Sequence, residues 1–231
     1  CNLLVQAFDD EVWGTGSGQD GYQFWEACVD WQAPMSSTLN TGPRVPTAEF
    51  DAELCASDPC VPQPSTGVRL ATLSHFTMNR FVLRFLEGTP LPTGLRGVLS
   101  HTVDLGGDRA GIRWVQFELP ELGLISIADT ATLGPSDDRH RWMPAIGLDR
   151  IGNMGGVYSR SGPSSFPSVY FASQHIGDPA GTLRQESSCI DGTGVQTILD
   201  GRWGDYASIS IDPVDQCTFW MTNEYVETTG E

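Results

Sequence analysis

Hydrophobic and polar residues alternate in short runs along most of this chain, and almost no stretch shows the helical period. Runs of four to eight residues with alternating or continuous apolar side chains are typical of β-strands. Clusters of Gly, Pro, Asp and Asn separate these runs and are typical of turns. The pattern predicts strands at residues 3–8, 80–85, 111–117, 123–128, 142–148, 155–159, 168–172, 206–211 and 217–222.

A repeated phrase links several of the predicted strands. An Arg-Trp pair leads into a strand and an Asp turn in RWMPAIGLDRIGN and again in RWGDYASISIDPVDQ, and a third pair is Arg113-Trp114. The Asp turns at Asp104, Asp149 and Asp212 are about 45 and about 63 residues apart, and a propeller blade of four strands takes about 40 to 50. We therefore expect an all-β fold, a β-propeller or partial β-propeller of three to five four-stranded antiparallel blades.

The organisation expected along the chain is a single domain over residues 1–231. An immunoglobulin-like sandwich is the main alternative, but it leaves the repeated Arg-Trp phrase unexplained. Residues 33–67 differ from the rest because they are rich in Pro, Ser and Thr and have no sustained periodicity. We expect a long excursion pinned by a disulfide there, of the kind that often forms a binding element.

Charge and composition narrow the classes of partner. The net charge is −16, and all the basic residues are Arg. Repulsion of this size argues against nucleic acid and against an anionic membrane surface as partners. No run of about 18 apolar residues occurs, so we expect no transmembrane segment. The chain opens on CNLLVQAF, which has the pattern of a strand in mid-course, and we expect a mature or processed piece of a longer precursor.

The cysteines form an even set without the tight spacing of a zinc site, which favours disulfides in an exported protein. Fifteen complete pairings are open. The turn-forming stretch between Cys55 and Cys60 favours a bridge that closes a short loop. Cys189 and Cys217 flank the last repeat and form a second expected pair, and Cys1 would then pair with Cys28 by default.

Several segments carry a resemblance to a known group of proteins. CVPQPSTGVRLATLSHFTMNRFVLR, LSHTVDLGGDRAGIRWVQFEL, DDRHRWMPAIGLDRIGN and GRWGDYASISIDPVDQCTFWMTNEY are similar to successive motifs of secreted bacterial proteins that resemble sialidase-like β-propellers. The likeness runs from about Cys1 to Tyr225, and its last motif is the most specific. It implies export and the later part of a larger propeller, completed by another chain or by a further segment.

A glycan-acting hydrolase of sialidase-like type is the alternative function. That chemistry needs an arginine cluster for a carboxylate, a Tyr-Glu pair and an acid/base Asp. Against it, arginines repeated from unit to unit are typical of packing elements rather than of one catalytic centre. The catalytic candidates are Arg113, Arg141, Arg202, Tyr158 and Tyr206, with Asp205 and Glu118 as further partners.

Structural calcium is the one cofactor that the sequence suggests, and no other is expected. Asp104 and Asp108 in DLGGD, and Asp212 with Asp215, place hard oxygen donors on tight turns. Neither pair has the full spacing of a calcium loop, and Asp at such positions also hydrogen-bonds its own turn.

A cluster of aromatic residues near the start of the chain is the main candidate binding surface. Such side chains stack on sugar faces, anchor protein interfaces, or fill the core of one blade. We expect an exported, non-catalytic recognition or scaffold module, extracellular, on the cell surface or periplasmic, whose partners are other protein chains or an extracellular glycan. The candidate residues are Trp13, Tyr22, Phe24, Trp25 and Trp31.

Overall fold

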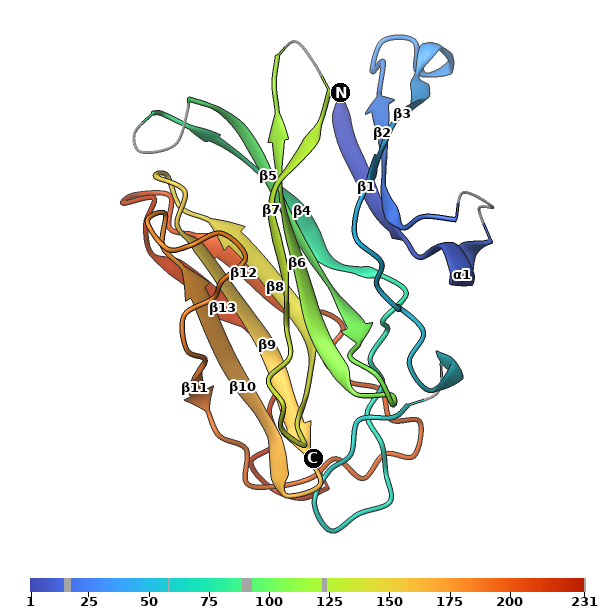
Figure 1. Ribbon diagram of the computed structural model, residues 1–231, viewed down its shortest axis with the longest axis vertical. Helices are drawn as coiled ribbons and strands as arrows, with labels where there is room; N and C mark the ends of the chain where they lie inside the picture. Colours follow the sequence, from blue (N-terminus) through green and yellow to red (C-terminus); the bar gives the residue numbers. More distant parts are fainter. Residues whose placement is uncertain (15–17, 58, 89–92, 122–123, 231) are drawn as a thin grey trace.

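The structure, a computed structural model, describes residues 1–14, 18–57, 59–88, 93–121 and 124–230. The all-β prediction is confirmed for this part of the chain: antiparallel sheets of two to four strands make up the fold (Figure 1). One four-residue α-helix, α1 (Asp10–Trp13), interrupts them, with Asp9 as its N-cap. In the described ranges no helix has the length and apolar character needed to cross a membrane.

Three strands form the first sheet, and two form the last. The first has the order β1-β2-β3, and the last is the hairpin β12-β13. Their bounds are Asn2–Phe8 (β1), Gly21–Cys28 (β2), Thr38–Pro46 (β3), Ser208–Ile211 (β12) and Phe219–Thr222 (β13).

Two four-stranded meanders lie between them, and each is built from consecutive strands. One consists of β4 (Thr77–Leu86), β5 (Gly94–Asp104), β6 (Ala110–Leu119) and β7 (Ser126–Leu133). The other consists of β8 (His140–Leu148), β9 (Met154–Gly162), β10 (Ser165–Gln174) and β11 (Ser187–Ile190). Their central strands are buried along most of their length because neighbouring sheets cover both faces.

Each sheet packs face to face on the next, and the core lies in the interfaces between them (Figure 1). Tyr22 and Phe24 of β2 meet Phe117 of β6 at ring-centroid distances of 5.2 and 5.1 Å. Trp114 packs with Ile146 between the two meanders. Further apolar contacts join the second meander to the last hairpin. The sheets are thus stacked in chain order, and no closure into a ring is found among the described residues.

Two predictions about the elements were wrong. Residues 33–67 were expected to lie outside the sheets, yet β3 falls within them, and Leu54 and Val61 are fully buried. The edge position of β3 explains the absence of a strand pattern, because most of its side chains face solvent on both sides. Strands β2, β5 and β11 also went unpredicted; β5 is buried along most of its length and β11 is exposed throughout, so neither alternates, and β2 mixes buried and partly exposed positions.

The Asp turns are confirmed as turns, but they do not mark equivalent positions. Asp149 and Asp212 follow the first strand of their sheets, whereas Asp104 follows a second strand. First strands begin at Thr77, His140 and Ser208, so the true repeat exceeds about 60 residues. The shorter spacing of about 45 residues runs from the second strand of one sheet to the first strand of the next, so it does not measure the repeat.

Candidate functional site

The three arginines of the repeated phrase do not converge. Arg113 is buried in β6, where its Nη2 donates to Thr47 Oγ1 at 2.9 Å and to the Ala48 carbonyl at 3.1 Å. Arg202 lies before β12 with 78% of its side chain exposed, paired with Asp205. Arg141 lies in β8, within a different group of charges. The tryptophans beside them are all buried in the core.

Arg141 is the centre of a buried charged cluster. Its guanidinium donates to both oxygens of Asp137, at 3.0 and 2.8 Å, and to both oxygens of Glu186, at 2.8 and 2.6 Å. Tyr158 donates its hydroxyl to Glu186 at 2.8 Å, and Arg160 donates to the same carboxylate at 3.0 Å. The structure therefore brings Arg141 and Tyr158 together, and adds Glu186, Asp137 and Arg160, which the sequence analysis did not select.

The charged groups of this cluster are paired with one another. Hydrogen bonds from Arg141 lower the pKa of Asp137 to about 2. Burial opposes ionisation of Glu186, but hydrogen bonds from Arg141 and Tyr158 outweigh it and lower the pKa to about 2. Burial and the Glu186 charge raise the pKa of Tyr158 above its ordinary value. All four acceptor oxygens are used, and Arg141 is fully buried, so this group has no open position for a substrate carboxylate.

The other hydrolase candidates lie elsewhere. Glu118 on β6 pairs with Arg96 on β5 at 3.1 Å, and Tyr206 is exposed in the loop before β12. Among the described residues, the sequence-predicted arginines and their Tyr and Glu partners are thus spread over three sheets.

The carboxylate oxygens of the aspartates proposed for calcium accept hydrogen bonds from the chain itself, mostly within their own turns. Asp104 accepts from the backbone N–H groups of Gly106, Asp108 and Arg109, and Asp108 accepts from that of Cys55. The same holds for the C-terminal pair. Asp212 accepts from the backbone N–H groups of Val214 and Asp215 and from the indole N–H of Trp220. Asp215 accepts from the backbone N–H and the hydroxyl of Thr218.

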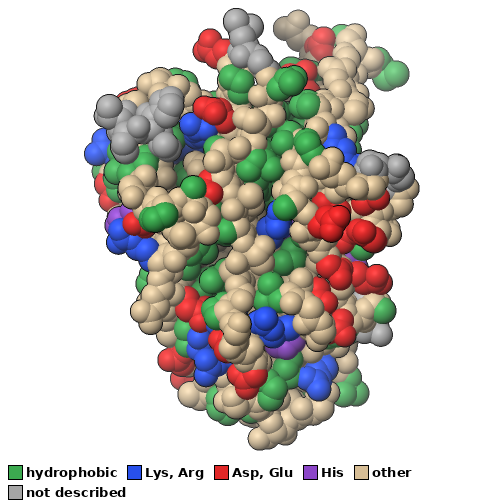
Figure 2. Space-filling view, viewed as in Figure 1, with side chains coloured by type: hydrophobic (Ala, Val, Ile, Leu, Met, Phe, Trp, Pro, Cys, Tyr) green, Lys and Arg blue, Asp and Glu red, His purple; other side chains and the backbone are tan. Residues whose placement is uncertain are grey.

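An acidic group that the sequence analysis did not select lies around α1. Oxygens of Asp9, Glu11 and Asp20 lie within 4.8 Å of one another, and Asp9 and Asp20 are buried. Asp9 accepts from Glu11, Val12 and Ala52 backbone N–H groups, and Asp20 accepts from Asp10 and Phe50. Figure 2 shows acidic side chains gathered over and below α1. The buried pair fastens α1 to the chain that follows β3.

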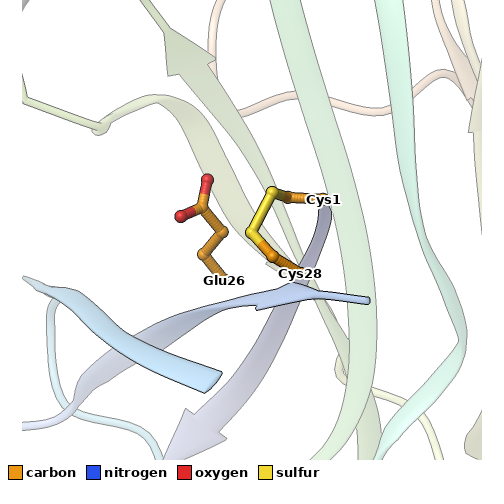
Figure 3. A group of neighbouring side chains, drawn as sticks. All are labelled: Cys1, Glu26 and Cys28. Atoms are coloured by element: carbon orange, nitrogen blue, oxygen red, sulfur yellow. A yellow bond between two sulfur atoms is a disulfide. The ribbon is translucent and has the colours of Figure 1, made fainter. Parts of the chain in front are cut away.

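One disulfide, Cys1–Cys28, is present and joins the ends of β1 and β2 (Figure 3). Figure 3 also shows Glu26 beside it, but a bridged sulfur is not a thiolate, so this group does not offer a cysteine ligand to a metal. Cys189 and Cys217 are free thiols, as are Cys55 and Cys60, so the two further bridges expected from the sequence are not formed. The side chains of Cys55 and Cys60 nevertheless hydrogen-bond each other.

The aromatic residues near the start divide into two groups. Tyr22 and Phe24 are fully buried in the core, and burial raises the pKa of Tyr22 to about 12. Trp13 is partly exposed, Trp25 is half-buried, and Trp31 is 86% exposed. The first group fills the interface with β4–β7, and the second faces away from it.

Apolar side chains form a patch on the outer side of the first sheet, beside the polar pair Gln6 and Gln23. Strand register places Leu4 opposite Trp25, and Ala27 opposite Leu39, on the side away from Tyr22 and Phe24. Leu4 is 48% exposed and Leu39 is 65% exposed. Phe8 extends the face, 6.2 Å from Trp25 and 6.1 Å from Trp13 between ring centroids. We call Leu4, Phe8, Trp13, Trp25 and Leu39 the outer face; Leu4, Phe8 and Leu39 lie outside the aromatic-rich stretch from Trp13 to Trp31 that the sequence analysis selected.

Comparisons with protein-family models, with curated proteins and with solved structures find no match to this chain. The resemblance to secreted proteins with sialidase-like propellers therefore stays a prediction.

Proposed function

We propose that this protein is a non-catalytic recognition module that works as a subunit of a larger assembly, in which another protein chain covers the outer face of the first sheet. The observation that carries this proposal is the apolar character of the outer face. An antiparallel sheet that meets water on one side normally alternates apolar and polar residues, whereas the outer side of β1 and β2 carries large apolar side chains, Leu4 and Trp25, next to the polar pair Gln6 and Gln23.

The stacking inside the chain supports the same conclusion. In the described part of the chain, the faces that successive sheets turn toward each other bring large apolar side chains together and bury them. A further sheet packed on the outer face would continue the stack, and the chain would then be part of a β-propeller. A net charge of −16 disfavours a second copy of this chain as that neighbour, so we propose a different chain.

Export is part of the proposal. The Cys1–Cys28 disulfide supports an extracellular, cell-surface or periplasmic location, because the cytosol keeps most thiols reduced. The non-catalytic role is supported by the buried cluster around Arg141, where carboxylates of the chain itself take the guanidinium that a hydrolase would present to its substrate.

Photo-crosslinking in the organism that makes the protein tests the proposal. A photoreactive amino acid is placed at Leu39 on the outer face, and at Val214 as a matched control, which is also highly exposed but lies on the β12–β13 turn. We expect a discrete crosslinked species from Leu39 and none from Val214. Equal labelling at both positions, or no crosslink from Leu39, would contradict an interface on the outer face.

A further inference from the structure

Two segments far apart in the sequence form a groove at the lower end of the molecule in Figure 1. Residues 59–76 and 199–206 run side by side, joined by a hydrogen bond from Ala71 N–H to the Gly201 carbonyl at 2.8 Å. Gly201 has φ +67°, and a Cβ there would lie 2.3 Å from the Arg69 carbonyl oxygen. The close approach therefore requires glycine. Between the segments lies a groove of about 460 Å³, and a second of about 490 Å³ shares Pro59 with it.

The groove combines exposed aromatic rings with charged hydrogen-bonding groups. Phe76 is 51% exposed and Tyr206 is 58% exposed, and both line it. Arg202 and Asp205 line it as an ion pair with 2.6 Å between Nη2 and Oδ2, and Asp200 contributes another carboxylate. Ligand sites commonly pair apolar rings with a few placed polar groups in this way.

The segment that forms the Tyr206 side of the groove, residues 202–206, is anchored to the rest of the fold. Trp203, between Arg202 and Asp205, is fully buried and donates its indole N–H to Ser159 Oγ at 2.9 Å. The Gly204 N–H donates to a carboxylate oxygen of Glu224 at 2.6 Å. A segment anchored in this way loses little conformational freedom when a ligand binds.

We propose that this groove binds a neutral oligosaccharide. A sugar ring has an apolar C–H face, which packs on an aromatic ring, and hydroxyl groups that both donate and accept hydrogen bonds. Phe76 and Tyr206 supply the rings, Arg202 supplies donors, and Asp200 supplies acceptors. The two adjoining grooves give an elongated site, which suits a chain of sugars better than a single one.

Charge sets the class of sugar. The two adjoining grooves together hold two carboxylates, those of Asp200 and Asp205, and two guanidinium groups, those of Arg202 and Arg69, and that of Arg202 is already paired with Asp205. On a chain with net charge −16, a uronate or a sialate would be repelled. The site therefore differs from a sialic-acid site, where an arginine cluster would face the ligand. The groove also shares no residue with the outer face. A negative result for sugar binding and a negative result for the proposed assembly role can therefore be told apart.

Calorimetric titration of the purified chain with chitohexaose, cellohexaose and oligogalacturonate tests the assignment. We expect saturable binding of at least one neutral oligomer, with the acidic oligomer about 10-fold weaker or undetected. Tyr206→Ala and Phe76→Ala should each weaken binding about 10-fold, the size of effect that a central aromatic residue often has. Trp220→Ala is the matched control, because Trp220 is an exposed aromatic outside the groove. It should leave affinity unchanged.

Tyr206→Phe keeps the ring and should retain affinity, which separates stacking from loss of the hydroxyl. NMR shifts of the Tyr206 ring in the wild-type protein give a second readout that needs no variant. Absence of binding by both neutral oligomers at millimolar concentration would overturn the assignment. Tighter binding of the acidic oligomer, or equal weakening by Tyr206→Ala and Trp220→Ala, would overturn it as well.

Discussion

Arg141 shows at the scale of one residue how the repeated Arg-Trp phrase is used. Its guanidinium is fully buried and paired with two carboxylates, Asp137 and Glu186. Burying charges costs free energy that only close pairing and hydrogen bonding offset. The residue that looked like a catalytic candidate thus holds the end of β8 to the chain before β11, and its role is structural.

Removing this guanidinium takes two hydrogen bonds from each of Asp137 and Glu186 in a poorly solvated place, and leaves Glu186 with Arg160 and Tyr158 alone. We expect Arg141→Ala to lower the free energy of unfolding by about 3–5 kcal/mol. Arg202→Ala is the control, since the Arg202 side chain is 78% exposed, and we expect a loss of less than about 1 kcal/mol. Urea denaturation of both variants measures the difference. Similar losses would show that the buried cluster is no more important to stability than a surface pair.

Two buried histidines make stability depend on pH. Burial, with the Arg113 charge, lowers the pKa of His101 to about 3, and burial, with the Arg109 charge, lowers that of His140 to about 4. The unfolded chain binds these protons near pH 6.5 and the folded chain does not. Stability is therefore complete above about pH 6.5 and falls as the pH decreases toward these folded-state values.

The measurement for this prediction is the urea midpoint between pH 8 and pH 5, with NMR of the histidine ring protons. The midpoint should fall over this range while the His101 and His140 signals stay in their neutral positions. Protonation of either ring above pH 5 in the folded protein would contradict the prediction.

At the scale of elements, the two free thiols in the second half of the long excursion, residues 33–67, are close enough to interact. Cys55 and Cys60 hydrogen-bond each other, and burial raises the pKa of both thiols. Mild oxidation with diamide takes two electrons and two protons from a thiol pair and leaves a disulfide. We expect the Cys55–Cys60 bridge to form and Cys189 and Cys217 to stay unlinked, as peptide mapping by mass spectrometry would show. A peptide joining Cys189 to Cys217 would contradict the arrangement of the sheets.

The sequence predicted some elements well, and the physical reason is periodicity. Strands at the positions of β1, β8 and β10 were found because apolar runs end at clear turn residues. β3 was missed because its exposed edge does not select for apolar residues. The β1–β2 bridge was predicted, but only as the pair left over from two others.

The candidate sites were harder to predict than the strands. The burial of Arg141 depends on Glu186, 45 positions away, and no local pattern announces that contact. The groove has the same origin, because it needs residues 59–76 and 199–206 side by side. Tyr206 was selected from the sequence for a catalytic role, and it lies at the groove with Arg202 rather than beside Arg141.

At the scale of the whole molecule, the described residues form four sheets that stack in chain order, and none of these residues covers the outer face of the first sheet. Each interface inside the stack joins large apolar side chains, which is the main source of stability in such a fold. A stack of this kind gains most when its open face is also removed from water. Completion by another chain is therefore the central claim of this account.

The most direct test is the native mass of the protein taken from its source, by light scattering on size exclusion. We predict a particle heavier than the 25.1 kDa of this chain, containing a second kind of chain, and a shift to the single-chain mass in a Leu39→Asp variant. A wild-type particle of 25.1 kDa would contradict the claim.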